Sequence, residues 1–221
     1  MSRSIIFRSV FFVATLIVSG LALSSALAQD ATTTEPIAQS SSVYRFSDGS
    51  QVEDSFARLT RFDNGVTLAL SSDDLNPGNV YTVWWVIFNA PENCSDGVCN
   101  ADDLLMFEDG VVPRDEAGNR LMNMDGIAAA NISILHAAGG FAVDDTLNTS
   151  ASLGLGDVPG IVAGPGLLDA QTAEIHIVIR THGAANEEAF ADQLSTFGGG
   201  CEPMDALPCE DVQYAMFEPA S

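Results

Sequence analysis

Lysine is absent from this 221-residue chain, so its eight basic residues are all arginines, set against thirty aspartates and glutamates. Arg3 and Arg8 precede the first acid, which leaves six arginines and thirty acids after Ala28, a net charge of −24 with histidine neutral. Nucleic acid and anionic lipid are bound through cations that neutralise phosphates. We therefore expect no nucleic-acid partner and no anionic membrane surface. The charge is compatible with a bound cation or small ligand, and it does not specify a protein partner.

Common catalytic signatures are also missing. The chain has no G-x-S-x-G elbow, no H-E-x-x-H pair and no P-loop. Gly154-Leu155-Gly156 is not a dinucleotide fingerprint, because the third glycine is misplaced and no βαβ unit surrounds it. A serine–histidine–acid triad or a carboxylate pair is defined in space rather than by order, so neither is excluded. The sequence alone therefore assigns no activity.

Long apolar runs are missing after residue 28, but residues 10–23 form one directly after the two N-terminal arginines. The run ends in Ser24-Ser25-Ala26-Leu27-Ala28, which has the small residues of an Ala-x-Ala cleavage site. A retained membrane anchor is less well supported, because a span needs ~20 apolar residues. We predict a signal peptide over residues 1–28, cleavage near Ala28, and a secreted or periplasmic protein.

The remaining chain divides by composition. Residues 29–42, QDATTTEPIAQSSS, are small and polar, so we predict a flexible leader. Residues 43–221 suit a single domain, and a chain of this length buries roughly 70% of its unfolded surface. Residues 92–125 hold nine acids against two arginines and form an acidic excursion. Long insertions of this kind often carry function.

Cysteine is scarce, with four residues spaced C-x4-C and C-x7-C. An even number in an exported chain favours disulfides, and three pairings are possible. We favour the local pairs Cys94–Cys99 and Cys201–Cys209, because each closes a loop that contains turn-forming residues. A structural zinc site is the alternative, but zinc sites usually pair cysteines at C-x2-C spacing.

Strand signals dominate the domain. Asp63-Asn64-Gly65 predicts a hairpin turn before the alternating strand of residues 66–71. The run YTVWWVIFN, residues 81–89, is apolar on both faces and predicts a central strand. Further strands are expected at residues 55–62, 131–136, 149–155, 174–181 and 212–217, and the only helix at 186–194. The sequence therefore predicts an all-β antiparallel sandwich, of Greek-key, Ig-like or jelly-roll type, with at most one short helix.

Three stretches carry a resemblance to a group of exported bacterial proteins of unknown function: LNPGNVYTVWWVIFNAPENC, EIHIVIRTHG, and the ending FGGGC…C-x2-VQYAMFE. The segment RLTRFDNGVTLALSSDDLNPGNVYTVWW is also similar to secreted β-sandwich modules, including the chordin-type domain. These resemblances imply a β-sandwich and export. They imply no activity.

EIHIVIRTHG, residues 174–183, holds two of the three histidines. In a strand, Glu174, His176, Arg180 and His182 share one face and the isoleucines share the other. His176 and His182 are roughly 20 Å apart at ~3.3 Å per residue, so they cannot share a metal along a straight strand. We expect a solvated or hydrogen-bonded polar face with Arg180 paired to Glu174 or another acid. The alternative is a Cu²⁺ or Zn²⁺ site that combines His136 with His176 or His182 and a carboxylate.

The acidic excursion offers oxygen ligands for Ca²⁺. No stretch of it fits an EF-hand loop. A solvated acidic loop is the simpler interpretation, and bound Ca²⁺ would raise the melting temperature by mass action. The candidate ligands are Asp102, Asp103, Glu108, Asp109, Asp115, Asn119 and Asp125.

The aromatic strand invites a carbohydrate-binding hypothesis through Tyr81, Trp84 and Trp85. Core packing is the better interpretation, because the two tryptophans point to opposite, otherwise apolar faces. We therefore expect a non-catalytic binding or structural module that could bind a cation. The alternative is a secreted metal-dependent or carboxylate-based enzyme with its site near His176, Arg180 and His182. A deep pocket lined by the histidines would favour the enzyme, and a flat polar face the module.

Overall fold

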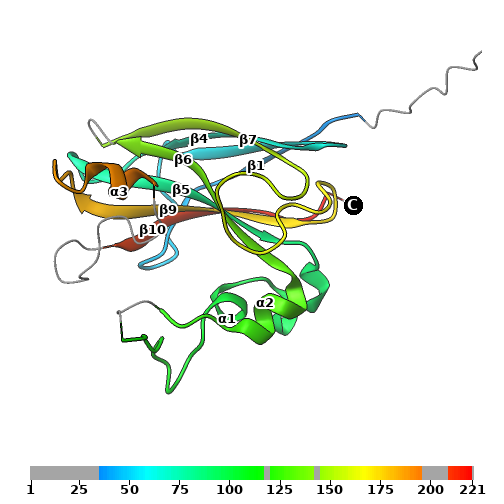
Figure 1. The fold of residues 1–221 in the computed structure, drawn as a ribbon. Coiled ribbons are helices and arrows are strands. Elements are labelled where there is room, and N and C mark those ends of the chain that lie inside the picture. The colour runs from blue at the N-terminus through cyan, green and yellow to red at the C-terminus, as the bar shows by residue number, and fades with distance from the viewer. Residues whose placement is uncertain (1–34, 117–119, 142–144, 196–208, 221) are drawn as a thin grey trace, which may run out of the picture. The chain divides into compact units, whose positions relative to one another are not determined.

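The computed structural model describes residues 35–116, 120–141, 145–195 and 209–220, with the side chains of residues 137–141 left out. These residues form two antiparallel sheets, which Figure 1 shows as stacked layers of strands. The four-stranded sheet has the order β1 (Ile37–Ser41), β3 (Phe56–Phe62), β4 (Gly65–Ser72), β7 (Leu147–Gly154). The six-stranded sheet has the order β2 (Tyr44–Arg45), β10 (Glu210–Phe217), β9 (Glu174–Ala184), β5 (Asn79–Phe88), β6 (Ile132–Phe141), β8 (Ile161–Ala163).

The connection from β4 to β7 is of the Greek-key kind. The chain leaves β4, forms the β5–β6 pair in the other sheet, and returns to place β7 beside β4. This return of the fourth strand to the first defines the motif. The predicted antiparallel all-β sandwich is thereby confirmed.

The core lies between the sheets. Side chains along β3 and β4 alternate between the core and the outer face. Leu59, Leu68 and Leu70 are among those that point into the core. The three isoleucines of β9 face them from the other sheet, as predicted, and none is more than 1% exposed. β5 is buried along nearly its whole length, which confirms a central strand whose two faces are both covered.

The expectation of at most one short helix is wrong. The structure has α1 (Ala101–Leu104), α2 (Met124–Ala130) and α3 (Phe190–Ser195), with 3-10 turns at Pro91–Asn93 and Ser95–Gly97. Only α3 falls in the predicted region. α1 and α2 are too short for a helical hydrophobic period to show, and each depends on a capping asparagine, Asn100 or Asn123. Within the described residues, no helix is long and apolar enough to cross a membrane.

The predicted flexible leader contains a strand. β1 pairs with β3 from Ile37↔Arg61 to Ser41↔Ala57, so the sandwich begins earlier than residue 43. β1 is an edge strand held by backbone hydrogen bonds, and it needs few apolar side chains. A composition rich in Ser, Thr and Gln therefore hid it. Residues 29–34 lie outside the described residues.

Arg61 joins the two sheets from inside. Its side chain is fully buried on β3, and its guanidinium donates to Gln39 Oε1 at 2.6 Å. The other acceptors are backbone carbonyls, those of Ala170 at 2.6 Å, Ala173 at 2.9 Å and Glu218 at 2.8 Å. Burial lowers the pKa of Arg61 to about 10, a shift opposed by the charge of Asp169, so the guanidinium stays protonated at neutral pH. One cation thus replaces several apolar contacts at this end of the core.

Candidate functional site

The polar side of β9 lies on the outer face of the six-stranded sheet, and it is buried rather than solvated. His176 is 8% exposed, Arg180 7% and His182 0%. The expected solvated face is therefore wrong, whereas the expected hydrogen bonding and the pairing of Arg180 with an acid are correct. The segments that follow β5 and β9 cover this face, which strand periodicity alone does not reveal.

His176 is paired with Glu174 on its own strand. The Nε2 atom of His176 lies 2.6 Å from the Oε1 atom of Glu174. The imidazole also lies against the ring of Phe88 on β5, with the ring centroids 4.9 Å apart. This arrangement orients one face of the ring against an apolar neighbour and one nitrogen toward a carboxylate.

Arg180 pairs with Asp211 on the neighbouring strand β10. Its Nη1 atom donates to Asp211 Oδ1 at 2.7 Å, and the second oxygen of Asp211 lies 3.4 Å from Nη1 of Arg120. Arg120 belongs to the acidic excursion, so Asp211 joins the excursion to the sheet. The pairing of β9 with β10 shifts register between Asp211 and Gln213, which is a β-bulge.

His182 belongs to a buried chain of hydrogen bonds. Trp84 Nε1 donates to Thr82 Oγ1 at 2.7 Å, and Thr82 Oγ1 lies 2.7 Å from His182 Nε2. The Nδ1 atom of His182 lies 3.4 Å from the sulfur of Cys209, which is disulfide-bonded and has no proton to give. In the neutral imidazole, Nδ1 therefore carries the proton and Nε2 accepts from Thr82.

His136 stands apart from the other two histidines. It lies opposite Trp84 in the β5–β6 pairing, and the two rings meet edge to face with centroids 5.3 Å apart. Its Nε2 atom is buried and has no hydrogen-bond partner. Burial lowers the pKa of His136, which favours the neutral ring.

The three histidines thus have three separate environments. Within the described part of the chain, no three His, Cys, Asp or Glu side chains converge to hold a metal ion. Trp84 separates His136 from β9, because it pairs with His136 on one side and with Val178 on the other. The structure does not bring together the combination of His136 with His176 or His182.

The Ca²⁺ candidates are also dispersed. Asp102, Asp109 and Asp115 are exposed, as are Glu108 and Asp125, and Asn119 lies outside the described residues. Asp103 is 3% exposed, and it accepts from the backbone N–H groups of Ser95 at 2.7 Å and Asn100 at 3.0 Å. Asp103 is therefore a structural residue that organises the start of the excursion.

Of the two predicted disulfides, Cys94–Cys99 is present. Both sulfurs lie in a second, smaller apolar cluster, in which Cys94, Cys99 and Ala130 pack on Phe88 and Ile132 of the six-stranded sheet. For Cys201–Cys209, Cys209 is disulfide-bonded, but Cys201 lies outside the described residues, so its identity as the partner stays a prediction.

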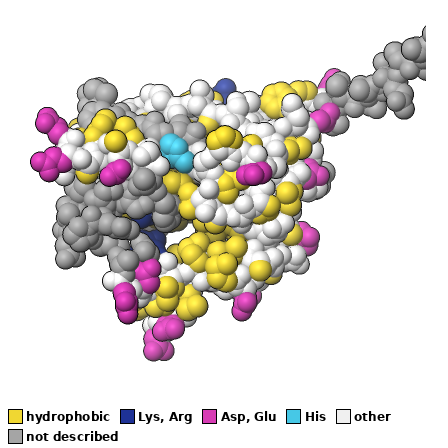
Figure 2. Space-filling view, viewed as in Figure 1, with side chains coloured by type: hydrophobic (Ala, Val, Ile, Leu, Met, Phe, Trp, Pro, Cys, Tyr) yellow, Lys and Arg dark blue, Asp and Glu magenta, His cyan; other side chains and the backbone are white. Residues whose placement is uncertain are grey.

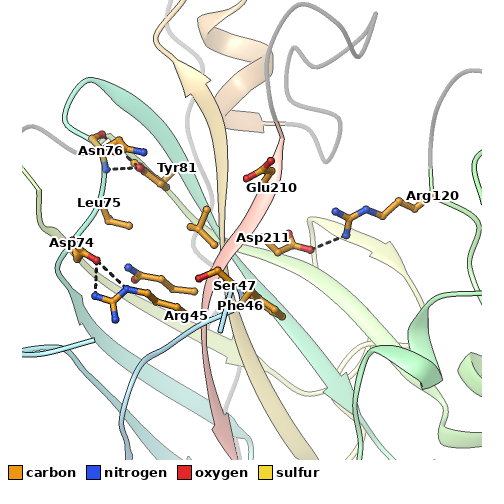
Figure 3. Close-up of a pocket in the computed structure, with 12 residues that line it drawn as sticks. Arg45, Phe46, Ser47, Asp74, Leu75, Asn76, Tyr81, Arg120, Glu210 and Asp211 are labelled. Carbon is orange, nitrogen blue, oxygen red and sulfur yellow. Dashed lines mark hydrogen bonds and ion pairs between the residues drawn. The ribbon is translucent and has the colours of Figure 1, made fainter. Parts of the chain in front are cut away.

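An open cleft of about 460 Å³ lies beside β2 and β10 at one edge of the six-stranded sheet (Figure 3). Arg45 donates to Asp74 Oδ2 from Nε at 3.0 Å and from Nη2 at 2.5 Å on one side, and Arg120 meets Asp211 on the other. Two arginines face three acids, the third being Glu210, and no histidine lines the cleft. Sequence reasoning missed it, because its walls come from segments far apart in the chain.

A second cleft, of about 840 Å³, lies between β1, β10 and the disulfide loop. Glu174 lines it together with Glu92 and Glu218. Glu174 is the one residue of β9 that lines either of these two clefts.

The excursion itself carries the largest gathering of exposed apolar side chains. Figure 2 shows hydrophobic side chains over the region of α1 and α2, with acidic side chains around them. Five of the twelve large exposed hydrophobics among the described residues belong to residues 92–125. They are Val98, Met106, Phe107, Val111 and Met124, which we call the excursion surface. The runs LLMF and VV within an acidic segment were the sequence signal for it.

The Trp84, Trp85 and Tyr81 side chains are at most 2% exposed, so the core-packing interpretation of these aromatics is correct. Comparison of the chain with family models, curated proteins and solved structures found no match.

Proposed function

We propose that the protein is an exported, non-catalytic binding module and that the excursion surface is its binding surface. The observation that carries the proposal is the exposure of large apolar side chains on the excursion, where Val111 is 66% and Met124 65% exposed. Contiguous apolar patches with a polar rim are typical of sites of interaction. The disulfide and the Arg120–Asp211 pair hold this segment to the sandwich.

The environments of the three histidines support a non-catalytic function. The rings of His176 and His182 are oriented by hydrogen bonds within the sheet, and His136 faces Trp84. A general base needs hydrogen-bond access to a substrate proton. Neither of the two clefts described above is lined by an imidazole.

Site-specific photo-crosslinking in the native host tests this function. A photoreactive residue at Val111 should give a discrete adduct with a protein partner, whereas the same residue at Val162 on β8, which is 52% exposed, should not. The same adduct from both positions, or none from Val111, would contradict a binding surface on the excursion.

A carboxylate-based enzyme is the second candidate, because Glu174 both pairs with His176 and lines the larger cleft. A carboxylate held beside an imidazole can act as a nucleophile or a base. An epoxide probe that alkylates nucleophilic carboxylates should then label the wild type at Glu174 and leave Glu174→Gln unlabelled. Labelling of many surface carboxylates without preference would count against this candidate.

A further inference from the structure

We infer that the excursion surface docks a cationic protein, one that presents an apolar centre surrounded by lysines or arginines. This inference rests on the proposed function and names the class of partner for the same surface. It is argued from the exposure of the apolar side chains, from the rigidity of the segment that carries them, and from the charge around them.

The apolar centre is made by large side chains that are exposed to solvent. On the inner side of the excursion, Leu104 and Ile127 pack against the second apolar cluster. Phe107 and Met106, by contrast, are 44% and 38% exposed, and Val98 and Val111, which precede and follow them in the sequence, are more exposed. Aromatic and methionine side chains are enriched at protein interfaces.

The described residues of the excursion are tied together by backbone hydrogen bonds. Glu108 and Val111 exchange two backbone hydrogen bonds, of 2.9 and 3.0 Å. Asp109 and Gly110 between them have φ of 52° and 78°, as in a type I′ turn. Met106 N donates to the carbonyl of Leu121 at 3.0 Å, which closes the loop below the turn. A preordered surface loses less conformational entropy on binding.

The surroundings of the excursion surface are strongly negative. Of the nine acids in residues 92–125, all except Asp103 are exposed. The segment has two arginines, and Arg120 is already paired with Asp211. A partner with cationic residues around an apolar centre would have complementary charge. That charge would orient the partner on the surface and raise its rate of association.

The same charge disfavours a second copy of the chain as the occupant. Each copy carries −24 after residue 28, and two excursions face to face would oppose eight exposed acids with eight more. Like charges across an interface are destabilising. We therefore expect the protein to be monomeric in the absence of its partner.

The test uses two synthetic amphipathic helical peptides, one built from leucine and lysine and one from glycine, serine and lysine with the same charge. Binding to the full exported chain is measured by fluorescence anisotropy. The leucine–lysine peptide should bind at least about tenfold more tightly than the peptide without leucine, because apolar anchors dominate interface energy. Equal affinities would show charge attraction alone and overturn the inference.

Matched variants locate the site. Val111→Ser with Met124→Ser should weaken leucine–lysine peptide binding about tenfold, whereas Val162→Ser with Leu168→Ser, also exposed, should leave it unchanged. Glu108→Gln, Asp109→Asn and Glu116→Gln together should weaken it more than Glu53→Gln, Asp54→Asn and Glu188→Gln. Both sets remove three exposed acids, and each includes an aspartate with φ near 55°. Equal losses within either pair of variants would overturn the inference.

The partner found by crosslinking separates the two proposals. Crosslinking of a cationic protein from Val111 supports both the binding module and the cationic partner. An acidic or neutral protein at Val111 would keep the binding module and overturn the cationic partner. A dimer of this chain, seen as crosslinking to itself and as a doubled mass by light scattering, would also overturn the cationic partner.

Discussion

Arg180 and Asp211 form their ion pair at the β-bulge where the pairing of β9 and β10 changes register. The pair is one of the points at which the sandwich and the excursion meet, because Asp211 also lies 3.4 Å from Arg120. Bulges re-aim side chains within a sheet. Here the bulge coincides with a carboxylate shared by two arginines.

Asp211→Asn should therefore lower the free energy of unfolding by about 2 kcal/mol, because it leaves a nearly buried guanidinium without its charged partner. Asp74→Asn is the matched control, since Asp74 pairs with the more exposed Arg45. Exposed pairs of that kind contribute less than about 1 kcal/mol. Urea unfolding of both variants checks the difference, and equal losses would contradict a special role for Asp211.

The hydrogen-bond chain through Thr82 gives a second prediction. Thr82→Val keeps the shape of the side chain and removes the hydroxyl that joins Trp84 to His182. We expect a loss of about 2 kcal/mol in unfolding free energy and a shifted indole N–H resonance of Trp84. Thr82→Ser retains the hydroxyl, so it should keep the resonance near its wild-type position. A valine variant with wild-type stability would show that this chain is not needed.

Acid should destabilise the fold partly through His136. Burial lowers the pKa of His136 below its ordinary value of 6.5, so the unfolded chain binds more protons between the lowered pKa and 6.5. Stability from this group is fully present above pH 6.5 and falls as the pH drops through that window. His136→Phe keeps an aromatic ring beside Trp84 and removes the titration.

The measurement is the unfolding free energy of wild type and His136→Phe from about pH 7.5 to about pH 5. The loss on acidification should be smaller in the variant, while carboxylates contribute equally to both proteins. A direct titration of the His136 ring by NMR provides a second check. Identical losses in the two proteins would contradict the role of His136.

Removing the disulfide should loosen the excursion before the sandwich. Replacing both Cys94 and Cys99 by serine removes a cross-link that closes a short loop. In the chain-entropy model, such a cross-link contributes about 2 kcal/mol to the free energy of unfolding. Hydrogen exchange should accelerate in α1 and α2, while the amides of β5 and β9 change less. Uniform acceleration across both sheets would show that the disulfide stabilises the whole domain equally.

Arg61 gives the last prediction. Arg61→Lys keeps the charge, but an ammonium cannot reach all the acceptors that the guanidinium bonds. We expect a loss of about 3 kcal/mol in unfolding free energy. Arg58→Lys on the same strand is the control, because Arg58 is exposed beside Phe56 and should cost less than about 1 kcal/mol. Similar losses would mean that charge, not fork geometry, matters at residue 61.

Periodicity predicted the sheets well but not what covers them. The apolar run of β5 and the isoleucines of β9 report burial directly, so the central strands and the class of fold were accessible. β1 was missed because an edge strand is held by its backbone. α1 and α2 were missed because four and seven residues hold too little of a helical period.

The candidate site was less accessible than the fold. The alternation of EIHIVIRTHG correctly separated its polar and apolar faces, and it predicted an acid for Arg180. It could not identify Asp211, which lies thirty-one residues later and meets Arg180 through strand pairing. It also could not show that the polar face is buried, because the covering segments are distant in sequence.

The position of β10 affects the order in which the fold can be completed. β10 is the last strand of the chain, yet it lies between β2 and β9, and two carbonyl acceptors of Arg61 follow at its end. A chain that emerges N-terminus first from a ribosome therefore cannot join β2 to its larger sheet until β10 has emerged. β2 and the guanidinium of Arg61 must wait for partners more than 150 positions away. The arrival of β10 thus completes both the strand order of the larger sheet and the hydrogen bonds of Arg61.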